Sequence, residues 1–284
     1  MNQSRTDAAL RWWGQESFAL EQAGCWRIGP TTLWAFRTRH DWRLLYESTG
    51  DPMQHDQHVE VPAAAERWHE LEEAATTDPA LTVHRHTFRE TPATLAIEPV
   101  LADRSIVVRP EHPLSIPAGE EVLLYLSTPL WIRIRVGDMT LEDIPSHRPS
   151  DTWFGPSPRD GELCYATRTA GRLTLSKLPM RAHRAVTPLT IRNEAAENFP
   201  LERVHVPTPY LALYESDSGV EDHLWTQGLT LTRESVGGNA EITIRQGPPE
   251  GTNATTELNG PRKEARSGLV VNTFRAIEGL FGGT

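Results

Sequence analysis

The stretch that decides the fold class is SIVVRPEHPLSIPAGEEVLLYLSTPLWIRIRV, residues 105–136. In 131–136 apolar residues alternate with Arg133 and Arg135, which is the two-residue period of a strand with one buried and one solvated face. The segment 117–120, Pro-Ala-Gly-Glu, separates two apolar runs and is typical of a turn, because proline presets φ and glycine tolerates a positive φ. This stretch predicts consecutive short strands joined by tight turns.

The same pattern continues in both directions. Short apolar runs bounded by proline or glycine recur from residue 81 to residue 245, and similar runs among the tryptophans of residues 1–50 indicate a β-meander. Residues 62–75 instead place apolar side chains at helical spacing, after a proline that suits a first helical turn. We therefore predict an all-β fold with antiparallel β-sandwich-like halves, one inserted helix and a C-terminal amphipathic helix.

The composition divides the chain into four regions. Residues 1–80 are expected to form the Trp-rich β-meander plus the helix, packed on the rest, and residues 81–246 a β-sandwich-like region. Residues 247–267 contain almost nothing apolar and are expected to be a flexible linker. Residues 268–284 carry apolar side chains three and four apart, so we expect the amphipathic helix there.

Composition also limits the function classes. The 28 lysines and arginines against 38 acidic residues give a net charge of −10, which disfavours binding to nucleic acid phosphates. No apolar run approaches the roughly 20 residues that a membrane-spanning helix needs. Two cysteines are too few for a disulfide scaffold. We expect a cytoplasmic protein that can associate with a membrane through a partner.

Seven short motifs along the strands are shared with one family of archaeal and bacterial proteins. They are IPAGE (116–120), TPL (128–130), WFG (153–155), GELCY (161–165), RAVTP (184–188), IRN (191–193) and LWT (224–226). With this set, the chain resembles the uncharacterised family "domain of unknown function 432", from the Trp-rich region to about residue 245. The resemblance implies no catalytic residues. The family's association with genes beside small-conductance mechanosensitive channels implies the cytoplasmic part of such a channel as a partner.

One candidate ligand-binding groove lies around Trp153 and Phe154, where aromatic side chains precede Gly-Pro. Arg133, Arg135 and Arg192 could then contact an anionic small molecule or a carbohydrate. The alternative is structural: the two aromatic side chains fill one end of the core, and the arginines line a solvated face.

His84 and His86 are the candidate metal ligands, because residues two apart on a strand face the same side. The alternative is that both are solvated side chains of an edge strand, and no complete metal site is predicted. Motifs of nucleophilic hydrolases and of phosphate-binding loops are absent from the sequence. We therefore expect no cofactor and a non-enzymatic protein, with a metal-dependent hydrolase as the least favoured hypothesis.

The preferred hypothesis is an accessory or regulatory protein that binds another protein through the C-terminal amphipathic helix. The apolar stripe of that helix consists of Leu269, Val270, Phe274, Ile277, Leu280 and Phe281. Such a stripe can dock in a partner's groove, fold back on the protein or lie on a membrane. The short polar face favours docking or self-packing.

Overall fold

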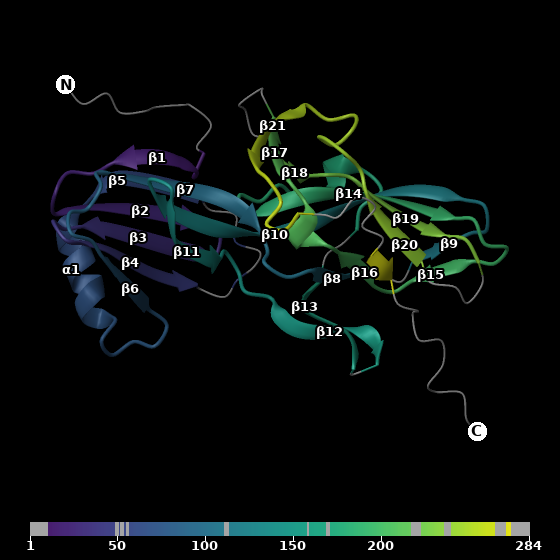
Figure 1. Cartoon of the computed structure of the whole chain (residues 1–284), viewed down its shortest axis with the longest axis horizontal. Coiled ribbons are helices and arrows are strands. Elements are labelled where there is room, and N and C mark those ends of the chain that lie inside the picture. Colours follow the sequence, from purple (N-terminus) through teal and green to yellow (C-terminus); the bar gives the residue numbers. More distant parts are fainter. Residues whose placement is uncertain are drawn as a thin grey trace.

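The computed structural model describes residues 11–48, 51, 54, 57–110, 114–157, 159–168, 171–216, 223–235, 240–264 and 271–273. These residues form an elongated molecule with two lobes, the N-terminal and the C-terminal lobe (Figure 1). The regular structure is predominantly β, with one inserted α-helix in the described part of the chain, as predicted from the sequence. No described helix is long and apolar enough to cross a membrane.

The N-terminal lobe contains a five-stranded antiparallel sheet of order β5-β2-β3-β4-β6. Its strands are β2 (Gln22–Ile28), β3 (Thr31–Arg37), β4 (Asp41–Ser48), β5 (Gln57–Ala63) and β6 (Thr82–Thr87). One face is covered by α1 (Ala65–Ala74), the helix predicted at 62–75. The helix is anchored by Trp68, which is fully buried and stacks on Phe36 of β3 with ring centroids 5.3 Å apart.

The other face of this sheet packs on a second antiparallel sheet of order β1-β7-β10-β11. Its strands are β1 (Gly14–Ser17), β7 (Thr94–Leu101), the second half of β10 (Glu121–Val136) and β11 (Met139–Pro145). Alternate side chains of both sheets form the core between them, among them Trp26, Trp42, Leu44, Ile132 and Ile134. The N-terminal lobe therefore has three layers: α1, the five-stranded sheet and the four strands of the second sheet.

β10 continues into the C-terminal lobe, where its first half pairs with β14 (Arg184–Asn193). Further strands extend that sheet: β17 (Leu213–Ser216), β18 (Leu224–Thr226), β19 (Leu229–Arg233), β20 (Ala240–Ile244), β21 (Ala254–Asn259) and β22 (Val271–Thr273). The sixteen residues of β10 thus contribute to the sheets of both lobes.

Two smaller sheets complete the C-terminal lobe. The first has the order β12-β13-β8-β16, with β12 (Ser150–Ser157), β13 (Asp160–Arg168), β8 (Ile106–Arg109) and β16 (Val204–Val206). The second pairs β9 (Leu114–Ile116) with β15 (Phe199–Leu201). Two short 3-10 helices, η1 (Leu175–Lys177) and η2 (Thr208–Tyr210), lie in the connections.

The lobes do not divide at residue 80. β6, β7 and β11, which come later in the chain, belong to the N-terminal lobe because they pair with its strands or share its core. Local composition does not reveal which distant segments pair as strands. For this reason the boundary expected at residue 80 differs from the observed one.

The region expected to be a linker is partly ordered against the protein. β21 pairs with β17, and Ala254 is buried. Asn259 donates a hydrogen bond to the carbonyl of Pro99, and Arg262 donates one to the carbonyl of Leu101. Hydrogen bonding thus holds a segment that has few apolar side chains.

The expected C-terminal helix is not seen. Residues 271–273 form β22, which pairs with β20, so these three residues are extended. The remainder of the expected helix lies outside the described residues. That part includes every residue of the partner-binding stripe: Leu269, Val270, Phe274, Ile277, Leu280 and Phe281.

Candidate metal centre

The two candidate histidines lie on β6, an edge strand of the five-stranded sheet. His84 is opposite Leu44 and His86 is opposite Trp42 in the register with β4. Directly opposite residues project to the same face, and Trp42 and Leu44 belong to the core between the two sheets. Both imidazoles therefore point toward the second sheet, at the border of this core.

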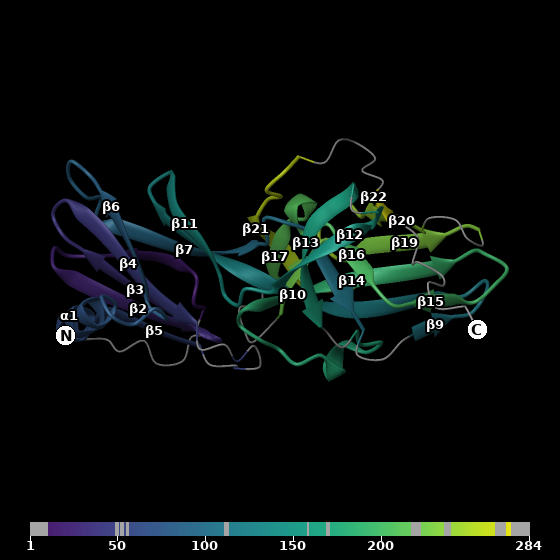
Figure 2. The ribbon, with the colours of Figure 1, turned by 90° about the horizontal axis from the view of Figure 1, so that it is seen from below.

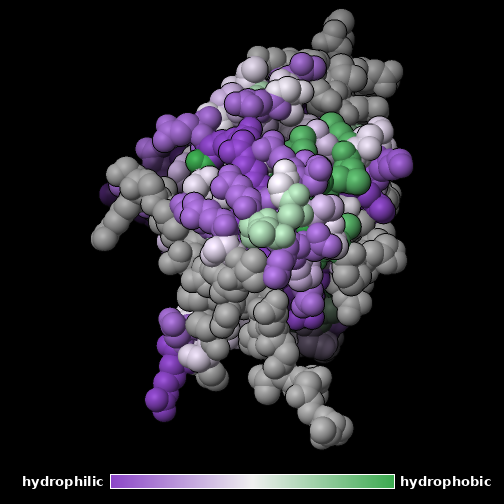
Figure 3. Space-filling view, turned by 90° about the vertical axis from the view of Figure 1, so that its right-hand side faces the viewer, coloured by the Kyte–Doolittle hydropathy of each residue, from purple (hydrophilic) through white to green (hydrophobic). Residues whose placement is uncertain are grey.

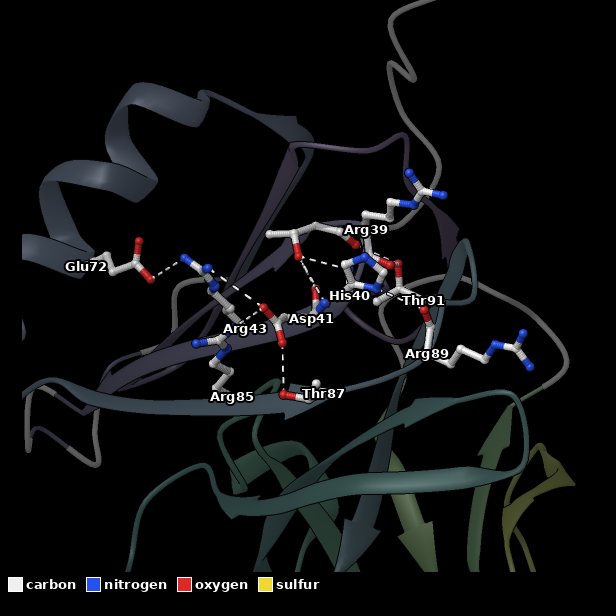
Figure 4. A network of polar contacts seen from close by, with 10 residues as sticks. Arg39, His40, Asp41, Arg43, Glu72, Arg85, Thr87, Arg89 and Thr91 are labelled. Atoms are coloured by element: carbon white, nitrogen blue, oxygen red, sulfur yellow. Dashed lines mark hydrogen bonds and ion pairs between the residues drawn. The ribbon is translucent and has the colours of Figure 1, made fainter.

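The opposite face of β6 is fixed by a polar network around the buried carboxylate of Asp41 (Figure 4). Arg85 and Thr87 donate hydrogen bonds to Asp41 over 2.6 and 2.9 Å. Arg43 lies 3.8 Å from the same carboxylate and donates a 2.8 Å hydrogen bond to Glu72 of α1. The hydrogen bond from Arg85 lowers the pKa of Asp41. This network holds β6 in one register and so sets which side the histidines face.

The third member of the cluster is Glu142 of β11, the edge strand of the second sheet. It is opposite Ile134, whose side chain is in the same core, so Glu142 also points inward. Its Oε1 lies 2.6 Å from Nδ1 of His84 and 3.3 Å from Nε2 of His86. Figure 2 shows β6 and β11 along the same border of the N-terminal lobe. Edge strands of two packed sheets thus supply three potential ligands to one point.

The cluster is half-buried. Relative to a fully exposed side chain, the exposed fraction is 36% for His84, 23% for His86 and 24% for Glu142. Solvent therefore reaches one side of the cluster. Nε2 of His86 is itself buried and donates or accepts no hydrogen bond among the described residues. Tyr46 contacts His84 edge-on at 5.8 Å, and burial, reinforced by Glu142, raises the pKa of this tyrosine. Nε2 of His86 therefore lies 3.3 Å from a carboxylate oxygen without forming a hydrogen bond to it.

The three donor atoms lie within 4.8 Å of one another. Two ligands bound at about 2.0–2.1 Å to a tetrahedral ion are roughly 3.3 Å apart. The distance from Oε1 of Glu142 to Nε2 of His86 already has this value. The distance from the same oxygen to Nδ1 of His84 would have to increase by several tenths of an ångström when a metal binds. Two imidazoles and one carboxylate suit zinc or another first-row divalent metal, and three ligands leave a coordination position for water.

The residues expected to form an anion-binding groove are not brought together. Arg133 forms a bidentate hydrogen-bonded pair with Asp143, and Arg135 pairs with Glu98. Arg192 pairs with Glu121, at the other end of β10 and in the other lobe. Each of the three guanidinium groups thus has a carboxylate partner on the sheet surface, which agrees with the structural alternative.

The aromatic pair expected in that groove divides between two faces of β12. Phe154 is buried and stacks on His205 of β16, whereas Trp153 is 42% exposed. The indole of Trp153 donates a hydrogen bond to the carbonyl of Ser157 in the same hairpin. β12 belongs to a different sheet from β10 and β14, the strands that carry the three arginines.

Comparison with known proteins gives one result for this chain. A family model described as "Protein of unknown function (DUF432)" matches residues 12–278. The chain belongs to this family. No curated protein and no solved structure matches it. The resemblance read from the motifs is confirmed, and the chemistry of this DUF432 protein has to be argued from its own residues.

Sequence reasoning identified two of the three candidate ligands in this DUF432 protein. The third, Glu142, is next to Asp143 on β11 and the two side chains point apart: Glu142 faces the histidines, and Asp143 faces Arg133 and Arg262. The sequence contains no signal that brings β11 to β6, because the two strands belong to different sheets. The strand alternation alone could have indicated that Glu142 is inward-facing.

Proposed function

We propose that this protein binds a divalent transition metal, with zinc as the reference ion, at His84, His86 and Glu142. The observation that carries the proposal is the convergence of both imidazoles on one carboxylate oxygen, over 2.6 and 3.3 Å. A pair of solvated edge histidines would not need an inward-facing glutamate from the opposing sheet. Carboxylate and imidazole are ordinary zinc ligands, and the orientation of both strands supports the assignment.

Such an ion would act first as a clamp. It would link the edge strands of the two N-terminal sheets, which have no main-chain hydrogen bonds to each other. The partial exposure of the ligands supports a fourth position that is open to water or to a small anionic ligand. Binding in the folded state alone would raise the free energy of unfolding.

The test is a zinc titration of the full chain after removal of metal with a chelator. We expect binding by calorimetry, and its loss at this site in His84→Ala, His86→Ala and Glu142→Gln. The matched control is His58→Ala, since His58 is an exposed histidine on β5, the opposite edge of the same sheet. Unchanged zinc binding in folded His86→Ala and Glu142→Gln proteins would refute the assignment.

Protein binding is the second candidate function. It is supported by an exposed apolar pair, Trp153 and Leu163, which are directly opposite each other on β12 and β13 and are 42% and 46% exposed. The end of the C-terminal lobe is by contrast mostly hydrophilic, with apolar side chains in small separate groups (Figure 3). We suggest the cytoplasmic part of a small-conductance mechanosensitive channel as the first partner to test, as the family resemblance implies, and with it a cytoplasmic location.

Affinity capture separates the protein-binding surfaces. We expect Trp153→Ser together with Leu163→Ser to remove capture of a purified channel domain while the fold is retained. If a chain that ends at residue 264 loses capture and the double variant does not, the contact belongs to the C-terminal residues instead. Absence of capture by the full chain would remove the channel as a partner.

A further inference from the structure

A second cluster of metal-ligating side chains lies on the four-stranded sheet of the C-terminal lobe. Glu162 and Cys164 are two residues apart on β13 and therefore face the same side. His205 lies on β16, which is separated from β13 by β8. It is opposite Val107 of β8, which belongs to a small apolar cluster with Cys164 and Phe154. The three side chains thus share one face of the sheet.

The contacts within this cluster are close. Nε2 of His205 is in direct contact with Oε1 of Glu162, and the thiol of Cys164 lies 3.4 Å from the same oxygen. One donor atom from each of the three side chains lies within 4.8 Å of the other two. As in the first cluster, a single carboxylate oxygen is the point of convergence.

The surroundings separate this cluster from solvent on one side. Cys164 is fully buried and the side chain of His205 is 2% exposed, whereas Glu162 is 49% exposed. Phe154 stacks on the imidazole with centroids 5.0 Å apart, and Arg203 lies over the outer face of Phe154. Nδ1 of His205 is buried without a hydrogen-bond partner among the described residues.

A reactive cysteine does not fit this setting. Burial, reinforced by Glu162, raises the pKa of the Cys164 thiol, which disfavours a thiolate nucleophile. The hydrogen bond from His205 lowers the pKa of Glu162 to about 2. A metal ion that binds the sulfur displaces the thiol proton, because a coordinating thiol is deprotonated outright.

We propose that Glu162, Cys164 and His205 form a second metal site, softer than the first, for zinc or a similar thiophilic ion. Binding forms one bond each from the metal to sulfur, to Nε2 of His205 and to Glu162. It releases the thiol proton to solvent and leaves the neutral imidazole with its proton on Nδ1, with no change of oxidation state. The exposed side of Glu162 leaves room for water as a fourth ligand. The two sites differ in chemistry, because only this one contains sulfur.

Cobalt(II) is the probe, because a cobalt–thiolate bond produces an intense charge-transfer absorption in the near ultraviolet and imidazole or carboxylate ligands do not. The full chain, metal-free and reduced, is titrated with cobalt chloride. We expect the charge-transfer band in the wild type, its loss in Cys164→Ser, and a tenfold or greater weakening of cobalt binding in His205→Gln, which keeps the thiol.

Cys25→Ser is the matched control, since Cys25 is also buried but faces α1 in the other lobe, outside both clusters. It should keep the band at full intensity. Glu142→Gln should also keep it, because that variant removes only the first site. The Glu142→Gln variant therefore tests the first site, on which the proposed function rests, separately from the second site. The inference is overturned if saturating cobalt gives no charge-transfer band, or if the band survives in folded Cys164→Ser or folded His205→Gln without loss of affinity.

Discussion

Nδ1 of His84 lies 2.6 Å from Oε1 of Glu142, although the residues belong to edge strands of different sheets and are 58 positions apart in sequence. The described strands of the two sheets share an apolar interface but no main-chain hydrogen bonds. This polar contact at the border of the interface therefore joins β6 to β11 directly. An ion held there would add coordination bonds at a position where β6 and β11 are otherwise joined by apolar packing and by this polar contact.

We predict that zinc raises the melting temperature of the wild-type protein. Zinc at 100 times its dissociation constant adds about 2.7 kcal/mol to the free energy of unfolding. Scanning calorimetry with and without zinc measures the shift. In Glu142→Gln the shift should fall and in His58→Ala it should remain, with the second cluster accounting for any residual effect. Equal shifts in all three proteins would argue against a metal at this border.

Asp41→Asn is predicted to destabilise the N-terminal lobe in a pH-dependent way. The hydrogen bond from Arg85 lowers the pKa of Asp41 in the folded state, so the ionised carboxylate is bound more favourably there than in the unfolded chain. This stabilisation is fully present above the unfolded-state pKa of about 3.8 and disappears as the pH falls through the lower folded-state value. Urea unfolding at neutral pH and below pH 4 should show the stability gap between wild type and variant closing at acid pH. A gap that is the same at both pH values would contradict this account.

Trp68→Ala is expected to lower the free energy of unfolding by about 3–5 kcal/mol, the range for removing a large buried aromatic side chain. Trp68 is the only fully buried side chain of α1, and its stacking on Phe36 attaches the helix to β3. Denaturant unfolding measures the loss. Trp153→Ala is the control, because that indole is 42% exposed and its removal should cost much less.

Gly29→Ala is predicted to be more destabilising than Gly137→Ala. Both glycines have nearly the same left-handed backbone, with φ of +56° and +58°, so the conformational cost of alanine is similar. A methyl group at residue 29 would lie 2.2 Å from Nδ1 of His183, whereas at residue 137 it meets nothing within 4 Å. The difference in melting temperature between the two variants isolates this clash. Equal destabilisation would show that His183 moves aside freely.

Local patterns in the sequence predicted the strands well but not their directions. Antiparallel sheets were predicted, whereas in the C-terminal lobe β13 pairs with β8, and β14 with β18 and β19, in parallel. The alternation at 131–136 and the turn at 117–120 appear as the second half of β10 and the turn before it. Helical spacing after Pro62 predicted α1 to within a few residues. Each of these signals depends on neighbours within one turn or one strand, and short-range periodicity records such neighbours directly.

Signals that depend on distant segments were not available from the sequence. Arg262 attaches the expected linker through the carbonyl of Leu101 and the carboxylate of Asp143, and neither partner is near it in the chain. Both metal-ligand clusters likewise join strands that are not consecutive. The sequence shows the pairs His84–His86 and Glu162–Cys164 as two-residue spacings. In each cluster the third candidate ligand, Glu142 or His205, is brought close only by the arrangement of the strands.

The sixteen-residue strand β10 has a consequence for how this protein could be dissected. A fragment cut at either end of β10 leaves one half without a central strand, and two sheets would then have open edges prone to aggregation. Neither half is therefore a transferable module, and recombination or gene fission within this chain would have to duplicate the strand to yield two viable pieces.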